Sequence, residues 1–280
     1  MKIIYYKSYW FENIGNAVID MGGVELLKQA IPGVEINFVG DPHYTHIKEY
    51  KDSLDKCNIG DYFVFAGCCL EGMAFRGKLK IFRELKKANP CLKYIILGGG
   101  AWNYPVDLVG VRRMVKEEPP FIFISRDDLS YKIGEGLAEY YYPGIDTGFY
   151  VSDCYKPLKK DSKYIVVTKY KGKFDDEGLK VIQVCHNTKE FPEDSFVSTR
   201  LEDYLDLYAN AYKVYSRKVH ACVMSFSYGR PALLSGGWYE RATLFKKIGI
   251  DKVWEMSNPN MDRIKEEKEK QVKFLREALK

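Results

Sequence analysis

The sequence predicts an α/β fold of two Rossmann-like domains that face each other across a cleft. Apolar segments of strand length alternate with segments of helical period along most of the chain, which is typical of parallel sheets covered by helices. The alternation starts afresh after a polar stretch at residues 151–162, which contains Pro157 and serves as the candidate linker. We therefore expect one domain at residues 1–150 and a second at 151–280.

The first half contains five segments of strand length, and one of them, Tyr62–Gly67, is continuously apolar, as expected of a parallel strand buried on both faces. The five segments are Ile3–Tyr6, Val34–Val39, Tyr62–Gly67, Tyr94–Leu97 and Phe121–Ser125. Helical patterns lie between them at Ala17–Ala30, Lys78–Ala88 and Val106–Lys116. Pro32-Gly33 and Asn89-Pro90 mark the ends of the first two helices, because proline and glycine interrupt helical geometry.

The second half repeats this order. Strands are predicted at Tyr164–Thr168, Lys180–Cys185, Val214–Ser216 and Ala232–Leu234. Helices are predicted at Leu201–Ala211, His220–Phe226, Tyr239–Ile248 and Met261–Leu279. We expect the last of these, which is long and charged, to cross back towards the first domain.

The overall charge argues against a nucleic-acid-binding protein. The formal net charge is only +5, and Lys alternates with Asp and Glu on the faces of the predicted helices instead of clustering. This mild excess suits a small anionic ligand.

The N-terminal residues have the pattern of a strand and lack the pattern of a signal peptide. No apolar stretch reaches the ~18 residues that a membrane-spanning helix needs. We expect a cytoplasmic protein without a transmembrane segment. The oligomeric state is left open.

The cysteines and histidines do not predict a metal site. The chain has seven Cys, an odd number, and no CxxC pair, which favours buried thiols in a reducing compartment. His43 and His46 form an isolated HxxH pair without a third or fourth ligand nearby in the sequence. We therefore expect no bound metal.

Ligands of open parallel sheets bind beyond the carboxyl ends of the strands, so the residues that follow each strand are the candidates. Asn13-Ile14-Gly15-Asn16 follows the first strand and opens a helix, where the backbone can approach an anion closely. The same residues also fit an ordinary strand-to-helix turn with an Asn cap. Gly98-Gly99-Gly100 ends another strand, and we take Gly99 and Gly100 as candidates for close approach to a substrate, although tight packing explains them equally well.

Cationic and histidine side chains follow other strands. Arg126 comes after the strand that ends at Ser125, and its planar guanidinium suits a phosphate or carboxylate, although a surface pair with Asp127 or Asp128 is the plainer alternative. The run Arg217-Lys218-Val219-His220 is the densest signal, since two cations and a histidine lie at the start of an apolar helix. His220 is our candidate general acid, and a buried histidine bonded to a carbonyl is equally compatible. His186 directly follows a further predicted strand.

Taken in order, these segments resemble the polysaccharide pyruvyltransferase family. Asn13-Ile14-Gly15-Asn16 is similar to its Asn-x-Gly-Asn/Asp opening, and Arg126 to Ser130 is similar to its Arg-Asp-x-x-Ser motif. Asp146-Thr147-Gly148-Phe149 resembles its Asp-Pro-x-Phe segment, with Thr in place of Pro. The stretch Arg217–Pro231, with Lys218-Val219-His220 and Gly229-Arg230-Pro231, resembles its Arg-Leu-His … Gly-x-Pro signature.

The resemblance implies a GT-B-like fold and the transfer of a pyruvyl group from phosphoenolpyruvate to sugar hydroxyls, which forms a ketal on a polysaccharide or glycan precursor. It implies that Arg126, Lys218 and His220 contact the donor. It also implies a donor side in the second domain, an acceptor side in the first and no cofactor besides these substrates. Lys218 stands where the family pattern has Arg, with Arg217 one position earlier.

Two other functions fit the same residues. A GT-B glycosyltransferase could use the cations and the histidine to bind the diphosphate of a nucleotide sugar. A carbohydrate-binding protein without catalytic activity could retain the fold, and the cationic cluster would then be dispensable for binding.

Overall fold

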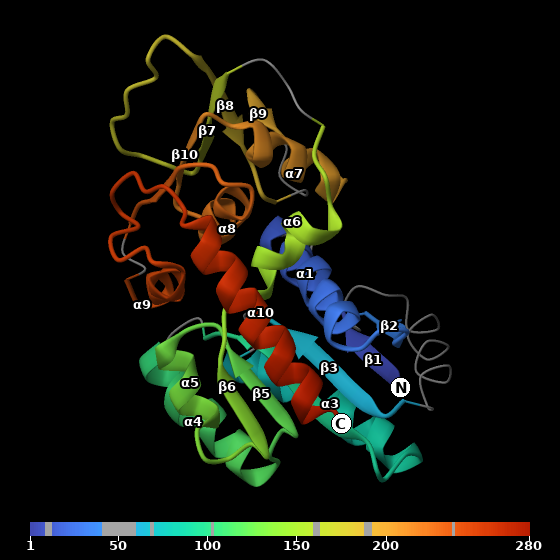
Figure 1. Cartoon of the computed structure of the whole chain (residues 1–280). Helices are drawn as coiled ribbons and strands as arrows, with labels where there is room; N and C mark the ends of the chain where they lie inside the picture. Colours follow the sequence, from blue (N-terminus) through green and yellow to red (C-terminus); the bar gives the residue numbers. More distant parts are fainter. Residues whose placement is uncertain are drawn as a thin grey trace. The chain divides into compact units, whose positions relative to one another are not determined.

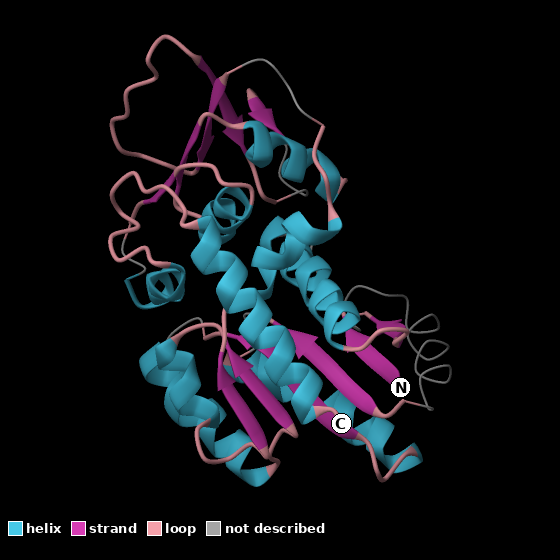
Figure 2. Cartoon of the chain, in the orientation of Figure 1, coloured by secondary structure: helices cyan, strands magenta, loops and turns pink. Residues whose placement is uncertain are grey.

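The computed structural model describes residues 1–8, 13–40, 60–67, 70–101, 104–158, 163–187, 192–236 and 239–280. Within these ranges the strands form two separate sheets, one of six strands and one of five, and every pair of neighbouring strands runs parallel (Figure 1). Figure 2 shows helices beside both sheets, and several of them connect one strand to the next. The predicted α/β class with two Rossmann-like sheets is confirmed.

The chain divides into two compact units that are not contiguous halves. Unit 1 comprises Met1–Tyr9, Leu26–Thr147 and Lys270–Lys280, whereas unit 2 comprises Trp10–Glu25 and Gly148–Glu269. Relative to the expected division at residue 150, residues 10–25 and 270–280 each belong to the other unit. The last helix, α10 (Met261–Ala278), therefore begins in unit 2 and ends in unit 1.

The sheet of unit 1 has the strand order β2-β1-β3-β4-β5-β6. These strands are β1 (Lys2–Tyr6), β2 (Glu35–Val39), β3 (Tyr62–Ala66), β4 (Lys93–Gly99), β5 (Ile122–Ser125) and β6 (Tyr140–Pro143). From β1 the chain runs first to β2 on one side and later to β3 on the other. The carboxyl ends of β1 and β3 therefore flank a topological switch point, where ligands of open α/β sheets bind.

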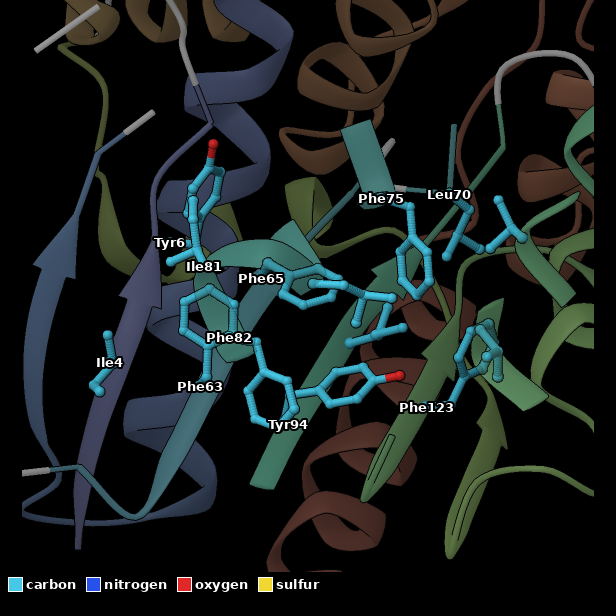
Figure 3. Close-up of a cluster of buried hydrophobic side chains, with 14 of the residues drawn as sticks. Ile4, Tyr6, Phe63, Phe65, Leu70, Phe75, Ile81, Phe82, Tyr94 and Phe123 are labelled. Atoms are coloured by element: carbon cyan, nitrogen blue, oxygen red, sulfur yellow. The ribbon is translucent and has the colours of Figure 1, made fainter. Parts of the chain in front are cut away.

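Aromatic side chains fill the core on one face of this sheet (Figure 3). Phe65 of β3 stacks on Tyr94 of β4 with 5.9 Å between ring centroids, and Phe82 of helix α3 (Gly72–Ala88) lies 4.9 Å from the same tyrosine. Helix α4 (Tyr104–Glu117) packs against α3 and against α5 (Asp128–Gly134). At the end of α10, the ring of Phe274 stacks on Tyr142 of β6 at 4.8 Å.

The sheet of unit 2 has the order β11-β10-β7-β8-β9. Its strands are β7 (Tyr164–Thr168), β8 (Lys180–Val184), β9 (Ser195–Phe196), β10 (Lys213–Ser216) and β11 (Ala232–Leu234). The chain leaves β7 towards β8 and β9, and then returns to the opposite side of β7 to form β10. This places a second switch point between the carboxyl ends of β7 and β10.

The helices of unit 2 pack around this sheet. Helix α8 (Val219–Ser227) packs against β10, β11 and helix α7 (Leu201–Asn210), and α7 also packs against β7. The unit also contains the start of helix α1 (Ile14–Ala30) and the short helix α9 (Tyr239–Ala242). The helix predicted at 239–248 is split, because a 3₁₀ helix at Thr243–Ile248 follows α9.

The structure differs in detail from the secondary structure that the sequence predicts. The candidate linker begins with helix α6 (Val151–Cys154), because Val151 is fully buried and Lys268 bonds to Ser152 and Asp153; residues 159–162 of the linker lie outside the described residues. Helix α3 begins at Gly72 instead of Lys78, because Phe75 already packs in the core. Strands β6 and β9 were not expected, since β6 is a partly exposed edge strand that ends in Pro143 and β9 spans two residues.

Candidate functional site

The start of helix α1 lies against both candidate histidines of unit 2. The backbone N–H of Ile14 donates to the carbonyl oxygen of His186 at 3.0 Å. A Cβ atom added to Gly15 would lie 2.5 Å from Nδ1 of His220, far inside contact distance. Glycine at position 15 therefore lets the His220 ring approach the helix. We call Gly15, His186, Tyr208, Lys218 and His220 the histidine cluster.

Asn13 caps helix α1. Its side-chain Oδ1 accepts from the N–H of Gly15 at 3.1 Å, and its backbone oxygen accepts from the N–H of Asn16 at 2.9 Å. With Ile14 bonded to His186, the first amides of the helix are bonded within the protein. These bonds are those of a strand-to-helix turn with an Asn cap, the simpler alternative for this motif. In addition, Gly15 allows the close approach of His220.

His186 is a buried, uncharged histidine at the carboxyl end of β8. It is 2% exposed, and its Nε2 lies 2.7 Å from the hydroxyl of Tyr208, which lies 2.7 Å from Oγ1 of Thr168. Burial is the main cause that lowers the pKa of His186 to about 3, and the charges of Lys218, His220 and Lys169 lower it further. His186 is therefore neutral at physiological pH and acts as a hydrogen-bonding group.

Cationic residues follow the two strands at the switch point of unit 2. Thr168 and Ser216 are paired in register at the ends of β7 and β10, so Lys169 and Arg217 are the next residues on adjacent strands. Lys169 is exposed and has a left-handed backbone with φ 52°, a conformation that side chains other than glycine rarely adopt. Sequence analysis did not single out Lys169, although it directly follows a predicted strand.

Arg217 and Lys218 continue this group of cations. The N–H of Arg217 donates to the carbonyl oxygen of Thr168 at 3.0 Å, and its side chain lies along Gly236, where an added Cβ would be 2.9 Å from Nε. The N–H of Lys218 donates to Oγ of Ser216 at 2.8 Å. Lys218 is the N-cap residue of α8, and His220 is the second residue of that helix and 5% exposed. Both side chains therefore lie beside the switch point.

Arg126 in unit 1 is fully buried in an ion-pair cluster. Its Nη1 donates to Oδ2 of Asp146 at 3.1 Å, and its Nε lies 3.7 Å from a carboxylate oxygen of Asp127. A Cβ added to Gly100 would lie 1.9 Å from Nε, so only glycine at position 100 leaves room for the guanidinium. The surface pair considered from sequence is therefore an internal pair, and its main partner, Asp146, lies 20 residues away along the chain.

The Arg-Asp-x-x-Ser motif has a structural explanation. Asp127 is the N-cap of α5, and its carboxylate accepts from the N–H of Ser130 at 2.7 Å and from the Ser130 hydroxyl at 3.1 Å. Asp127 and Asp128 therefore lie at the start of helix α5. A Cβ added to Gly99 would lie closest to the side chains of Ile96 and Leu70. In unit 1, the structure thus joins Gly100, Arg126 and Asp146 in one cluster.

The candidate residues fall into two groups. Gly99, Gly100 and Arg126 belong to unit 1, and Asn13, Gly15, Asn16, His186, Arg217, Lys218 and His220 belong to unit 2. That Arg126 and His220 face one cleft stays a prediction. The HxxH pair of His43 and His46 lies outside the described residues. Four cysteines within the described ranges, Cys91, Cys154, Cys185 and Cys222, are free thiols. None of the helices in those ranges is long and apolar enough to span a membrane.

Replacing Gly15 with Ala should displace the His220 ring, because the new Cβ would overlap Nδ1. We expect a loss of about 1–3 kcal/mol in the free energy of unfolding and a changed imidazole signal of His220 in NMR spectra. Gly110→Ala in α4 is the control, since nothing lies within 4 Å of its added Cβ, and it should be neutral or stabilising. A Gly15→Ala variant with unchanged stability and an unchanged His220 signal would contradict the contact.

The pKa of His186 predicts a pH dependence of stability. The folded pKa of about 3 lies below the ordinary value of 6.5, so only the unfolded chain takes up this proton as the pH falls below 6.5. This stabilisation is complete above pH 6.5 and should fall by roughly 1 kcal/mol per pH unit down to about pH 3. Urea unfolding between pH 4 and 7 should show a shallower dependence for His186→Gln than for Tyr208→Phe, which keeps the imidazole. Equal slopes would disprove the assignment.

The fold is similar to that of several solved nucleotide-sugar enzymes. A putative UDP-N-acetylglucosamine 2-epimerase from Listeria monocytogenes has a TM-score of 0.56 at 10% identity, covering 99% of this chain and 90% of that one. The UDP-GlcNAc 2-epimerase from Neisseria meningitidis, bound to UDP-GlcNAc, has 0.54 at 10%, covering 98% and 94%. S. aureus MnaA, in a structure with UDP, has 0.53 at 13%, covering 99% and 91%. These similarities establish a GT-B-like fold.

Sequence comparison identifies the family. Among curated proteins, none matches this sequence. The family model described as polysaccharide pyruvyl transferase matches residues 13–236, a segment that includes both the histidine cluster and Arg126. The resemblance first noted in the short motifs is confirmed. The chain is therefore a transferase and belongs to the polysaccharide pyruvyl transferase family.

Proposed function

We propose that this enzyme transfers the pyruvyl group of phosphoenolpyruvate to two hydroxyls of a sugar in a glycan or its precursor, forming a ketal. The observation that carries the proposal is the histidine cluster of unit 2. Lys218 and His220 flank the start of α8 at the switch point, with Lys169 and Arg217 on the two adjacent strand ends. A small donor with two or three negative charges requires such a group of cations around it.

The reaction balances without an oxidant or a reductant. A proton adds to the methylene carbon of the donor, which becomes a methyl group and leaves a cation at the neighbouring carbon. One sugar hydroxyl forms a C–O bond to that carbon and loses its proton. The second hydroxyl then loses its proton and forms the other C–O bond as the C–O bond to phosphate breaks, and inorganic phosphate leaves with the electron pair of that bond and takes up the released proton. No cofactor is part of the proposal.

Each residue of the histidine cluster has a proposed role. His220 donates the proton, since its buried imidazole lies two residues after Lys218 at the start of α8. Lys218, with Lys169 and Arg217, holds the carboxylate and the phosphate. His186 stays neutral and offers a hydrogen bond instead of a charge, and Tyr208 fixes its ring through Nε2. Gly15 provides the space that the His220 ring occupies.

Arg126 has a different place in the proposal. Its guanidinium has no exposed surface and is paired with Asp146, so it can bind a donor only if this pair opens. Breaking a buried pair is costly, because both charges then need new partners. We assign donor binding chiefly to unit 2 and leave unit 1 as the acceptor side, with Arg126 as a donor contact that depends on this rearrangement.

A thermal-shift panel tests the donor. Phosphoenolpyruvate at ~100 times its dissociation constant should add about 2.7 kcal/mol to the stability of the native state. Lys218→Met should remove most of this shift, because the cation that holds the donor is lost. Nucleotide sugars should give no comparable shift. Stabilisation by a nucleotide sugar and none by phosphoenolpyruvate would instead support a glycosyltransferase.

Replacing His220 with Ala should lower the pyruvyl-transfer rate by ~100- to 10,000-fold while donor-induced stabilisation remains. His220→Gln should not restore the rate, since an amide cannot deliver a proton. The readouts are release of inorganic phosphate in the presence of acceptor and the melting temperature. Activity and stability lost in parallel would indicate a structural histidine and contradict the role as acid.

A further inference from the structure

Lys78 is a cation in a core-facing position of helix α3. The buried residues of this helix are Phe75, Lys78, Leu79, Ile81, Phe82 and Leu85, and Lys78 shares the helical spacing of the apolar residues around it. It is only 7% exposed. Lysine is rarely buried to this degree unless it is paired. An apolar side chain would satisfy the packing at this position, so the core alone does not account for a lysine.

No carboxylate pairs with Lys78 among the residues that the structure describes. Its Nζ lies 5.0 Å from the ring centroid of Tyr6, which is a cation–π contact. A cation–π contact is weak compared with the cost of taking an ammonium out of water. The Tyr6 ring therefore does not replace a counter-ion.

Two other buried lysines have acidic partners, which offset the cost of removing an ammonium group from water. Lys213 lies 2.5 Å from a carboxylate oxygen of Glu177, and Lys268 lies 2.9 Å from Asp153. Both are 9% exposed, slightly more than Lys78. Lys78 differs from these two lysines, because it is at least as buried and has no acidic partner among the described residues.

The position of Lys78 in the sheet indicates what the missing partner is. Tyr6 is the last residue of β1, so the ammonium lies at the carboxyl edge of the sheet, beside the switch point between β1 and β3. In Figure 3 the hydroxyl end of Tyr6 points away from the aromatic core, towards this edge. Bound ligands, and not structural ion pairs, usually occupy this part of an open parallel sheet.

We propose that Lys78 forms an anion subsite in unit 1 that binds a phosphate or carboxylate group of the acceptor. An ammonium is a compact point charge that suits both groups. The inference deepens the proposed function, because it makes the acceptor of the pyruvyl group an anionic glycan or glycan precursor. The binding of the anion itself does not depend on the identity of the donor.

Lys78→Met and Lys80→Met form a matched pair of variants, since Lys80 lies on the same helix and is exposed. Binding is measured by calorimetry with two probes in the presence of saturating phosphoenolpyruvate. Inorganic pyrophosphate represents a phosphorylated acceptor, and glucuronate represents an acidic sugar. We expect at least one probe to bind to the parent and to Lys80→Met, and to bind at least tenfold more weakly to Lys78→Met. The probe that binds identifies the source of the anion.

The melting temperature without ligand gives a second readout. If Lys78 lacks a protein partner, the apolar Met should raise it, whereas a structural role of the contact with Tyr6 predicts a decrease. Lys78→Arg, which keeps the charge, should retain probe binding. Binding of either probe that is equal in Lys78→Met and Lys80→Met, or absent from the parent, overturns the subsite. A response to phosphoenolpyruvate that persists in Lys78→Met shows that the donor proposal stands independently.

Discussion

Neighbouring strands run parallel throughout both sheets, and this constraint decides where chemistry can take place. Parallel neighbours cannot be joined by a tight turn, so the chain crosses back through a helix or a longer loop, and all the strands of a sheet end at the same edge. In unit 2 that edge collects Lys169, His186, Arg217 and Lys218 from three different strands. In unit 1 it collects Arg126 and Asp146 from two more. Residues far apart in sequence meet there because the topology allows no other place.

Both units use a glycine to admit a large polar side chain to this edge. Gly100 lies under the guanidinium of Arg126, and Gly15 lies under the imidazole of His220. In each case a methyl group on the glycine would overlap the guanidinium or the imidazole. Packing against His220 and Arg126 thus accounts for Gly15 and Gly100, with no need for direct contact between either glycine and a substrate.

The sequence was sufficient to predict most of the fold and to select candidate residues at the strand ends, but it did not reveal pairs of residues that lie far apart along the chain. Strand and helix periods indicated both sheets, and the residues after each strand indicated His186, Lys218 and His220. The pairing of Arg126 with Asp146 and the bond from Tyr208 to His186 depend on tertiary contacts that no local pattern encodes. In the sequence, Lys78 resembles an ordinary charged residue of an amphipathic helix. The helical period does not reveal that this lysine is buried or that it lacks an acidic partner among the described residues.

The assignment of the final residues to unit 1 has a consequence for synthesis of the chain. Gln271 accepts a hydrogen bond from the N–H of Ile145, Phe274 stacks on Tyr142, and Arg276 donates to the carbonyl oxygens at the end of α1. These three contacts join residues more than a hundred positions apart. During translation, the first 147 residues leave the ribosome long before residues 270–280 have been made. Unit 1 therefore reaches its final form only after residues 270–280 have been made, and until then its sheet lacks part of its cover.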